Sequence, residues 1–375
     1  MLLINARVLM DGGFVPGMRV RLTHGCIADI SQGLMSLPGE DLLDLAGDHL
    51  LPGFVDVHIH AYRGRDAMQG ESAVRAMSRD LYAAGVAAFL PTTMSAPPED
   101  TARAVSGIRA VMARPEERAA RVLGTHMEAP FLSPEKAGAQ RAECLCPPDW
   151  SAFLTMTGGD VSAVRMLTLA PELPGADDFI RRAADAGIVV SLGHSAATAE
   201  QAHHAADLGA THVTHTFNAQ PPLHHRAPGL TGAALTDDRL YAEFIADGIH
   251  LHGDIVRLLC RAKGAERAVA ITDAMEAAGM PDGEYALGGQ PVTVKAGQAR
   301  LHDGTLAGSV LTMRQALHGL IHLFGIAPED AVRMCTATPA ESVGERVIGH
   351  MTPGSPVPLT RWSRDWEFIG IVEED

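Results

Sequence analysis

The spacing of hydrophobic and polar residues divides the chain into two kinds of segment. Residues 1–50 alternate short β-rich runs with turns, a pattern that is typical of antiparallel hairpins. After residue 50, short apolar runs alternate with amphipathic segments, in one of which Val74, Met77 and Leu81 recur at helical spacing. Strands that alternate with amphipathic helices predict a parallel α/β domain.

The number of these units points to one architecture. Eight apolar runs are predicted strands: residues 53–60, 87–92, 122–128, 163–170, 188–194, 212–218, 241–250 and 268–273. Helices are predicted between most of them, over residues 71–84, 100–114, 177–186, 199–208 and 254–262. Eight parallel strands alternating with helices are typical of a (β/α)8 barrel of the TIM type.

Two segments depart from the strand and helix rhythm. Residues 284–305 alternate like a hairpin and are expected to form an insertion after the eighth strand, and the tail from residue 353 is again β-like. We expect this tail to pair with the N-terminal strands. The predicted fold class is therefore α/β, with a (β/α)8 TIM-like barrel over residues 53–344. Residues 1–52 and 345–375, from both chain termini, are expected to form a small β-sandwich domain.

Composition and charge exclude several classes of partner. Hydrophobic residues make up 46% of the chain and charged residues 20%, which is ordinary for a globular protein. Acidic residues outnumber basic ones 45 to 30, so the net charge is −15. Nucleic acids and anionic membranes both require a basic surface, and we expect neither as a partner.

The cysteines and the apolar stretches indicate where the protein acts. The five cysteines are scattered without a C-x-x-C pair, so neither a disulfide framework nor a zinc ribbon is predicted, and a role for Cys144 and Cys146 stays open. The longest near-apolar stretch, residues 81–90, is far shorter than the about 20 residues of a membrane span. With no basic leader at the N-terminus, the expected location is the cytoplasm.

Histidines and carboxylates recur at the C-terminal ends of the predicted strands. In strand order these residues are His58, His60, Glu128, His194, His215, His250 and Asp273. Because the active site of such a barrel lies at these strand ends, we expect the side chains to converge at one mouth. Imidazole and carboxylate suit zinc, iron, manganese or nickel, and the absence of thiolates argues against a closed structural zinc site. The pattern predicts a metal centre.

Spacing along the strands refines this hypothesis. Residues two apart in a strand point the same way, so the rings of His58 and His60 can face one ion. The alternative is that each histidine is an ordinary core or surface residue, but this alternative does not account for so many of them at strand ends. None of the three lysines ends a predicted strand, which excludes a carboxylated lysine as a bridge between two ions. Any bridging ligand would then be Glu128.

Several motifs follow one another in a recognisable order. They are PGFVDVHIH, GTHMEAPFLSPEKAGA, SLGHSAAT, VTHTFNAQPPLHHRAPG, ADGIHLH, ITDAM and LAGS. In this order they resemble the N-acetylglucosamine-6-phosphate deacetylases of the amidohydrolase superfamily, over roughly residues 50–345. The HTFNA and PLHHRAPG segments are specific to the deacetylases, whereas the first motif alone indicates only an amidohydrolase.

The resemblance implies a role for each metal-site residue. Glu128, His194 and His215 would hold the catalytic metal, and His58 and His60, with Glu128 and Asp273, could hold a second ion. The expected cofactor is one or two divalent ions per subunit, with zinc first and iron, manganese or nickel as alternatives. Asp273 would be the general base and acid.

The resemblance also implies the residues that bind substrate, a phosphorylated amino sugar. They are Ala139, Asn218, Ala219, Arg226, His250, Leu306, Ala307 and Gly308. His250 and Arg226 would contact the phosphate, with Arg226 reaching into the site of a neighbouring subunit, which implies a homodimer. The last three would line the acetyl end.

The implied reaction is the hydrolysis of N-acetylglucosamine 6-phosphate to glucosamine 6-phosphate and acetate. Its chemistry suits the residues, because a bound ion lowers the pKa of its water to about 7 and a carboxylate can return the proton to the leaving nitrogen. Gln140 and Gln220 stand where the family commonly has His and Met. The galactosamine epimer therefore remains an alternative substrate. Hydrolysis of a different amide and a non-catalytic, metal-binding barrel are further alternatives.

Overall fold

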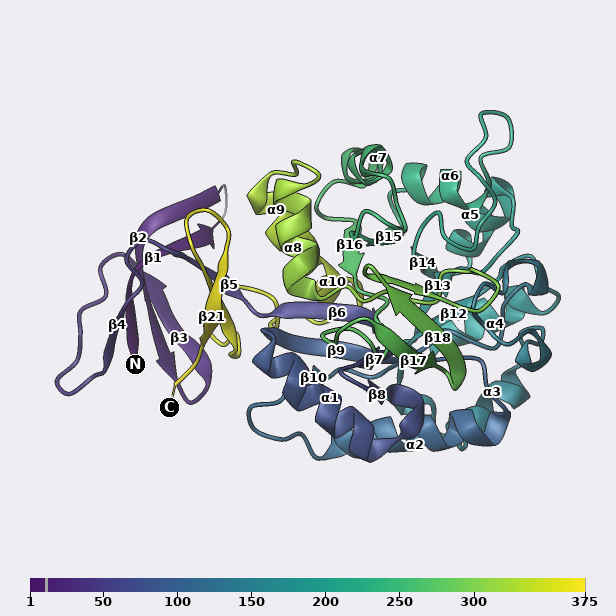
Figure 1. Cartoon of the computed structure of the whole chain (residues 1–375), viewed down its shortest axis with the longest axis horizontal. Coiled ribbons are helices and arrows are strands. Elements are labelled where there is room, and N and C mark those ends of the chain that lie inside the picture. The colour runs from purple at the N-terminus through teal and green to yellow at the C-terminus, as the bar shows by residue number, and fades with distance from the viewer. Residues whose placement is uncertain (11–12, 375) are drawn as a thin grey trace.

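An eight-stranded parallel barrel lies beside a separate β-sheet that both chain ends build (Figure 1). The computed structural model describes residues 1–10 and 13–374. The barrel and the terminal sheet confirm the expected α/β fold class.

All eight predicted barrel strands are present, the third of them in two pieces. They are β6 (Phe54–Ile59), β9 (Val86–Thr93), β10 (Arg121–Val122) with β11 (Thr125–Met127), β12 (Val164–Leu169), β13 (Val189–Leu192), β14 (Ala210–Val213), β15 (Tyr241–Ile245) and β16 (Ala268–Ile271). The third strand is interrupted around Gly124, where φ is 151° and an added Cβ would lie 2.5 Å from Arg165 Cβ. The backbone at Gly124 lies too close to Arg165 of the neighbouring strand β12 for any residue with a side chain to fit.

The barrel closes where β16 meets β6. The backbone N–H of Asp273 donates to the carbonyl oxygen of His58 at 2.8 Å, and Ile59 forms a parallel bridge with Ala274. Two residues before His58 in β6, the carboxyl group of Asp56 accepts a hydrogen bond from Thr272 Oγ1 at 2.5 Å. The first and last strands are therefore joined next to residues that the sequence predicts as metal ligands.

Helices cover the outside of the barrel. The five predicted helices are α1 (Glu71–Ala83), α2 (Pro98–Ala113), α4 (Ala176–Asp185), α5 (Ala199–Asp207) and α7 (Gly253–Lys263). The structure adds α3 (Trp150–Thr157), α6 (Gly229–Thr236), α8 (Met313–His322), α9 (Pro328–Cys335) and α10 (Ala337–Ser342), and the 3-10 helices η1 (Ala67–Gln69), η2 (Pro134–Lys136), η3 (Ala142–Cys144) and η4 (Val161–Ala163). Within residues 1–10 and 13–374, no helix has both the length and the apolarity to cross a bilayer.

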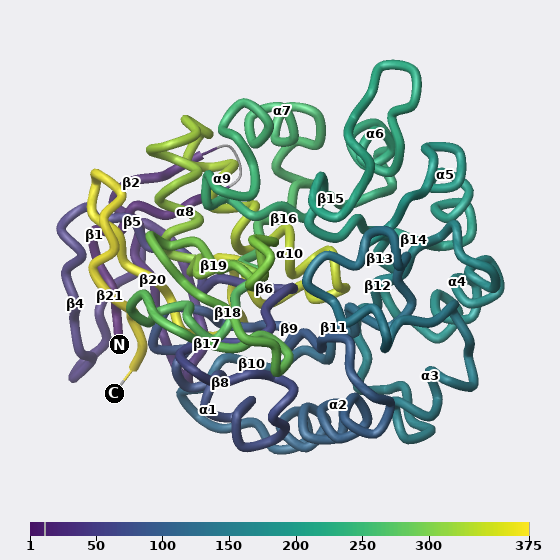
Figure 2. The backbone as a smooth tube through the Cα atoms, turned by 45° about the vertical axis from the view of Figure 1, so that its right-hand side comes forward, coloured from purple at the N-terminus to yellow at the C-terminus, as the bar shows by residue number. Residues whose placement is uncertain are grey.

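The terminal sheet has seven strands from the two ends of the chain. They are β1 (Leu2–Met10), β2 (Gly13–Thr23), β3 (Cys26–Ser31), β4 (Leu42–Asp44), β5 (His49–Pro52), β20 (Leu359–Trp362) and β21 (Phe368–Val372). β20 pairs with β5 in antiparallel fashion, so the tail does join the N-terminal strands, and the two termini lie side by side (Figures 1 and 2). Leu3, Val20 and Leu359 share one buried core. All seven strands belong to one hydrogen-bonded sheet.

Two small antiparallel elements sit near the barrel mouth. The hairpin β7 (Ala61–Tyr62) and β8 (Arg65–Asp66) follows β6, and β17 (Gly283–Leu287), β18 (Gln290–Lys295) and β19 (Gln298–Arg300) form a three-stranded sheet in the segment expected to be hairpin-like. Gln290 Nε2 donates to the carbonyl oxygen of Ala139 at 2.6 Å, and the N–H of Gly288 donates to Asp66 Oδ2 at 3.2 Å. These bonds tie the three-stranded sheet to loops at the mouth.

We expect Gly53→Ala to destabilise the junction between the terminal sheet and the barrel. An added Cβ would lie 2.6 Å from the carbonyl oxygen of Pro358 and 2.7 Å from Ala87 Cβ. The free energy of unfolding, measured by denaturant titration, should fall by about 1–3 kcal/mol because overpacking forces the backbone to shift. Gly370→Ala is the matched control, since nothing lies within 4 Å of its added Cβ. Equal stability of the two variants would contradict this account of the junction.

Candidate metal centre

All six predicted metal ligands come together in two triads at the barrel mouth. His58, His60 and Asp273 form one triad, and Glu128, His194 and His215 form the other. Within each triad the potential ligand atoms lie within 4.8 Å of one another, and all six residues are buried.

The backbone just beyond the strands directs these side chains into the mouth. His60 and Glu128 follow β6 and β11 directly, whereas His194, His215 and Asp273 each lie two residues beyond the end of their strand. The last three have left-handed backbones, with φ of 47°, 27° and 50°. The expectation that these residues end the strands is therefore wrong by one or two positions. Left-handed backbone is costly for a residue with a side chain and concentrates at functional sites.

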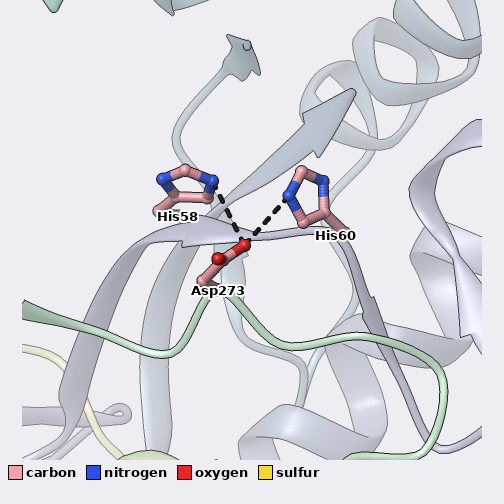
Figure 3. Close-up of side chains that lie close together, drawn as sticks. All are labelled: His58, His60 and Asp273. Carbon is pink, nitrogen blue, oxygen red and sulfur yellow. Dashed lines mark ion pairs between the residues drawn. The ribbon is translucent and has the colours of Figure 1, made fainter. Parts of the chain in front are cut away.

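The first triad joins His58 of β6 and His60, which directly follows that strand, to the carboxylate of Asp273, which lies just beyond β16 (Figure 3). The Nε2 atoms of His58 and His60 lie 3.5 and 3.1 Å from Asp273 Oδ1. Both rings turn the same nitrogen toward this one oxygen, as the spacing of two residues in a strand predicts. The closure of the barrel between β6 and β16 brings the three groups together.

The second triad centres on Glu128. Its Oε1 lies 3.1 Å from His194 Nε2 and 3.0 Å from His215 Nε2, and these two ring nitrogens are 3.1 Å apart. Glu128 also reaches the first triad, with Oε1 3.5 Å from His58 Nε2 and Oε2 3.4 Å from His60 Nε2. Glu128 thus lies between the two triads, where a carboxylate can serve as a ligand to both.

Hydrogen bonds on the far side of the rings fix which nitrogen faces the centre. His60 Nδ1 lies 3.2 Å from the carbonyl oxygen of Thr92, and His194 Nδ1 lies 2.8 Å from that of Lys136. A carbonyl oxygen only accepts, so each Nδ1 carries the hydrogen and each Nε2 turns a lone pair to the centre. His58 Nε2 is buried and has no hydrogen-bond partner among the described residues. Lone pairs and carboxylates gathered in this way fit a divalent metal ion.

The pKa shifts of the site show a need for positive charge, which either a proton on Nε2 of a histidine or a bound metal ion can supply. Burial opposes protonation of His60, but the hydrogen bond that its ring donates to Asp273 and the charges of Glu128 and Asp273 outweigh this effect and raise the pKa of His60 to about 9. Burial also acts to raise the pKa of Glu128, whereas the imidazoles of His58, His194 and His215 outweigh it and hold that pKa well below its usual range. The site therefore favours bound positive charge.

A cavity of about 250 Å³ opens onto both triads. Among the predicted substrate residues, those that line it are Ala139, Asn218, Ala219, His250, Leu306 and Gly308. Asp273 and Glu128 line it as well, whereas Ala307 is fully buried and does not line it. A larger groove of about 990 Å³, between the barrel and the terminal sheet, carries neither triad.

Of the two predicted phosphate ligands, only His250 lies differently from its sequence-based placement. His250 does not end a strand, because β15 stops at Ile245. It lies in the loop that follows, where Nδ1 is 2.7 Å from Asp247 Oδ2. Arg226 is exposed on a separate loop with its guanidinium group 2.8 Å from His225 Nε2, and it does not line the cavity of its own chain.

The two glutamines that depart from the family pattern have different surroundings. Gln140 Nε2 donates to Glu128 Oε2 at 2.6 Å, while its Oε1 accepts from the N–H of Ser95 at 2.7 Å. Gln220 instead donates to the carbonyl oxygen of Thr214 and accepts from Thr231. Only Gln140 therefore contacts a metal ligand and lines the cavity.

Sequence reasoning missed three carboxyl groups that support the site. Asp56 accepts hydrogen bonds from the backbone N–H of His58 and from Thr272 Oγ1, and so links β6 to the end of β16. Glu243 contacts the His58 ring, and Asp247 contacts the His250 ring. A signal for each is visible in retrospect: Asp56 lies two residues before His58, Glu243 interrupts an apolar strand, and Asp247 is part of the ADGIHLH motif. Burial raises the pKa of Asp56 to about 7.

Known proteins of similar sequence and structure are amidohydrolases. Residues 49–370 match the amidohydrolase family. The N-acetylglucosamine-6-phosphate deacetylase of Lysinibacillus sphaericus is 37% identical over 353 residues, covering 93% of this chain and 90% of the relative. The N-acetylgalactosamine-6-phosphate deacetylase of Escherichia coli O157:H7 is 35% identical over 356 residues, covering 93% and 91%. A solved structure of a mutant N-acetyl-D-glucosamine-6-phosphate deacetylase from Mycobacterium smegmatis, in complex with N-acetyl-D-glucosamine-6-phosphate, has a TM-score of 0.91 and 31% identity, covering 99% and 97%.

Replacing His194 and His215 together by Asn should remove the ion held by the Glu128 triad. The metal content per chain, measured by mass spectrometry of the purified protein, is expected to fall by one ion, because two of three ligands are lost. The matched control replaces His203 and His204, whose rings bond Asp237 and Asp177 on the surface. Metal content that is the same in both double variants would refute the assignment of this triad.

Proposed function

This chain belongs to the amidohydrolase family and, within it, to the N-acetylglucosamine-6-phosphate deacetylases, and from that premise we propose that it hydrolyses N-acetylglucosamine 6-phosphate to glucosamine 6-phosphate and acetate. One observation carries the proposal: Asp273 and Glu128 border one cavity, and the four imidazoles of the two triads gather around these carboxylates. Acetamide hydrolysis needs a strong nucleophile and a proton for the leaving amine, and these groups can supply both.

The cofactor that we propose is zinc, in one or two ions per chain. Four histidines and two carboxylates without a thiolate are typical of a catalytic zinc site, and iron, manganese and nickel accept the same donors. When bound, a divalent ion lowers the pKa of its water and polarises a carbonyl oxygen. Glu128, His194 and His215 would hold the first ion, and His58, His60 and Asp273, with Glu128 as a shared ligand, would hold the second.

Asp273 is the proposed base and acid. Its carboxylate takes a proton from the water that attacks the acetyl carbon. It then donates this proton to the sugar nitrogen as the C–N bond breaks, so that a neutral amine and acetic acid leave, and the acid releases its remaining proton to solvent to become acetate. The left-handed backbone of Asp273 and its contacts with His58 and His60 hold the carboxylate at the mouth of the cavity.

The sugar is proposed to lie along the cavity between the residues that line it. Asn218, Ala219 and Ala139 would contact the ring. Leu306 and Gly308, with the buried Ala307 between them in the chain, would enclose the acetyl group. His250, oriented by Asp247, would contact the phosphate. Exposed Arg226 would reach the phosphate in the site of a neighbouring subunit, since it does not line the cavity of its own, and the working enzyme is then a homodimer.

A second candidate substrate is N-acetylgalactosamine 6-phosphate. The Escherichia coli O157:H7 relative that carries this activity in its name is 35% identical, close to the 37% of the glucosamine enzyme. The amide of Gln140 faces the cavity where the family commonly has an imidazole, so the polar groups available to the sugar differ there.

Asp273→Asn should lose turnover while it keeps substrate and metal. General acid–base catalysis contributes about 10²- to 10⁴-fold, and kcat is expected to fall by that factor because an amide cannot accept the proton. KM and metal content should stay within a few-fold, since Oδ1 is retained as a ligand atom. Acetate release and metal analysis measure these quantities, and near-native turnover would remove Asp273 from the mechanism.

Arg226→Ala should raise KM for the phosphorylated sugar about 10- to 100-fold with little change in kcat, because a hydrogen bond between charged groups is worth about 1.5–3 kcal/mol. Turnover is compared for the glucosamine, galactosamine and mannosamine N-acetyl 6-phosphates and their dephosphorylated forms. The dephosphorylated sugars should be insensitive to the substitution. Arg103→Ala, an exposed arginine of α2, is the control.

Co-expression of Arg226→Ala and Asp273→Asn chains tests whether the arginine crosses between subunits. In a mixed dimer, the site that keeps Asp273 receives Arg226 from its neighbour, so low-KM activity should return. Failure of the mixture to recover such activity, with dimers present by size-exclusion chromatography, would mean that Arg226 does not act across the interface.

A further inference from the structure

Glu243 is a fully buried carboxyl group in the strand β15, and it contacts one residue of each triad. Its side chain has no exposed surface, and it does not line the substrate cavity. A carboxyl group in the interior of a barrel is costly unless its surroundings use it, since barrel interiors are ordinarily filled by apolar side chains. The partners of Glu243 therefore indicate its purpose.

One oxygen of Glu243 serves a ligand from each triad. Oε2 lies 3.1 Å from His58 Nδ1 and accepts from the backbone N–H of His215 at 3.4 Å. The backbone carbonyl of the same residue accepts from the N–H of Thr216 at 2.8 Å. Glu243 thus holds the ring of one ligand and the left-handed backbone segment that carries another.

The contact with His58 decides which nitrogen of that ring faces the metal centre. An acceptor at Nδ1 keeps the hydrogen there and leaves the lone pair on Nε2, which lies 3.5 Å from both Glu128 Oε1 and Asp273 Oδ1. His60 and His194 obtain the same orientation from backbone carbonyls. In the described part of the chain, His58 is the one ligand ring that depends on a side-chain carboxyl group, and Oε2 can accept whether or not that group is ionised.

We propose that Glu243 is a positioning residue for the metal centre, which orients the His58 ring and the His215 segment and so couples the two triads. This inference rests on the metal centre of the proposed function and is independent of the sugar. Because one acceptor oxygen carries the role, Gln should replace Glu243 and Leu should not.

The test measures Zn²⁺ affinity of the full-length protein by competition with a chromophoric chelator. Partners of metal-bound histidines are worth about 10- to 100-fold in metal affinity, so Glu243→Leu should weaken binding of at least one ion by that factor. Glu243→Gln should stay within a few-fold of the native protein. In the Co²⁺-loaded protein, the absorption bands should change for Leu and persist for Gln.

Thr168→Val is the matched control for disturbing the polar barrel interior. Its side chain is fully buried and its hydroxyl bonds His126 and Thr214, and within the described residues it forms no hydrogen bond with a member of either triad. Native Zn²⁺ affinity in a folded Glu243→Leu variant would overturn the proposal, as would losses of equal size in Thr168→Val. If Glu243→Leu does not fold, the Glu243→Gln variant decides. The proposal is overturned if Glu243→Gln loses as much Zn²⁺ affinity as a variant in which a metal-ligating histidine is replaced.

The outcomes separate this inference from the proposed function. A native protein that binds Zn²⁺ through Glu243-dependent ligands but releases no acetate would refute the deacetylase and support the positioning role. If the native protein is a deacetylase but its Zn²⁺ affinity does not change in the Glu243 variants, the proposed function would be supported and the positioning role of Glu243 refuted. A native protein that binds no divalent ion would overturn both.

Discussion

The structure depends on holding four imidazole nitrogens and two carboxylates within a few ångströms of one another, in side chains that are largely buried. The Nε2 atoms of His194 and His215 are 3.1 Å apart, and Glu128 touches both triads. Lone pairs and negative charges so close repel unless protons or a metal ion lie among them. The raised pKa of His60 has the same cause, because the nearby carboxylates stabilise a positive charge on its ring. A rigid scaffold is needed to maintain this arrangement before any ion binds.

The barrel supplies that rigidity at the point where it closes. The hydrogen bond from Asp273 to His58 is both the seam between the last and first strands and a link between two members of one triad. Strained backbone at His194, His215 and Asp273 can be sustained there because parallel strands on either side hold it. The hydrogen bonds that close the barrel therefore also hold the metal-centre residues in place.

Buried polar groups around the two triads orient the ligand side chains. Glu243 and the carbonyl oxygens of Thr92 and Lys136 select the ring nitrogens that face the centre, and Gln140 restrains Glu128 from the cavity side. Such partners determine ligand orientation in metal sites generally. The remaining wall of the cavity comes from loops, which can differ between enzymes that act on different sugars without disturbing the metal ligands.

The sequence by itself determined the eight strands, five of the helices and the six triad residues, because strand and helix periodicity and the position of a residue at a strand end are local properties. α6 was missed because it is short and buried nearly all round, so it shows no amphipathic pattern. The tertiary structure alone decided the left-handed turns and the loop position of His250. It alone paired Glu243 with His58, which lie 185 residues apart in the chain. Such contacts form only when the sheet closes, and no local pattern records them.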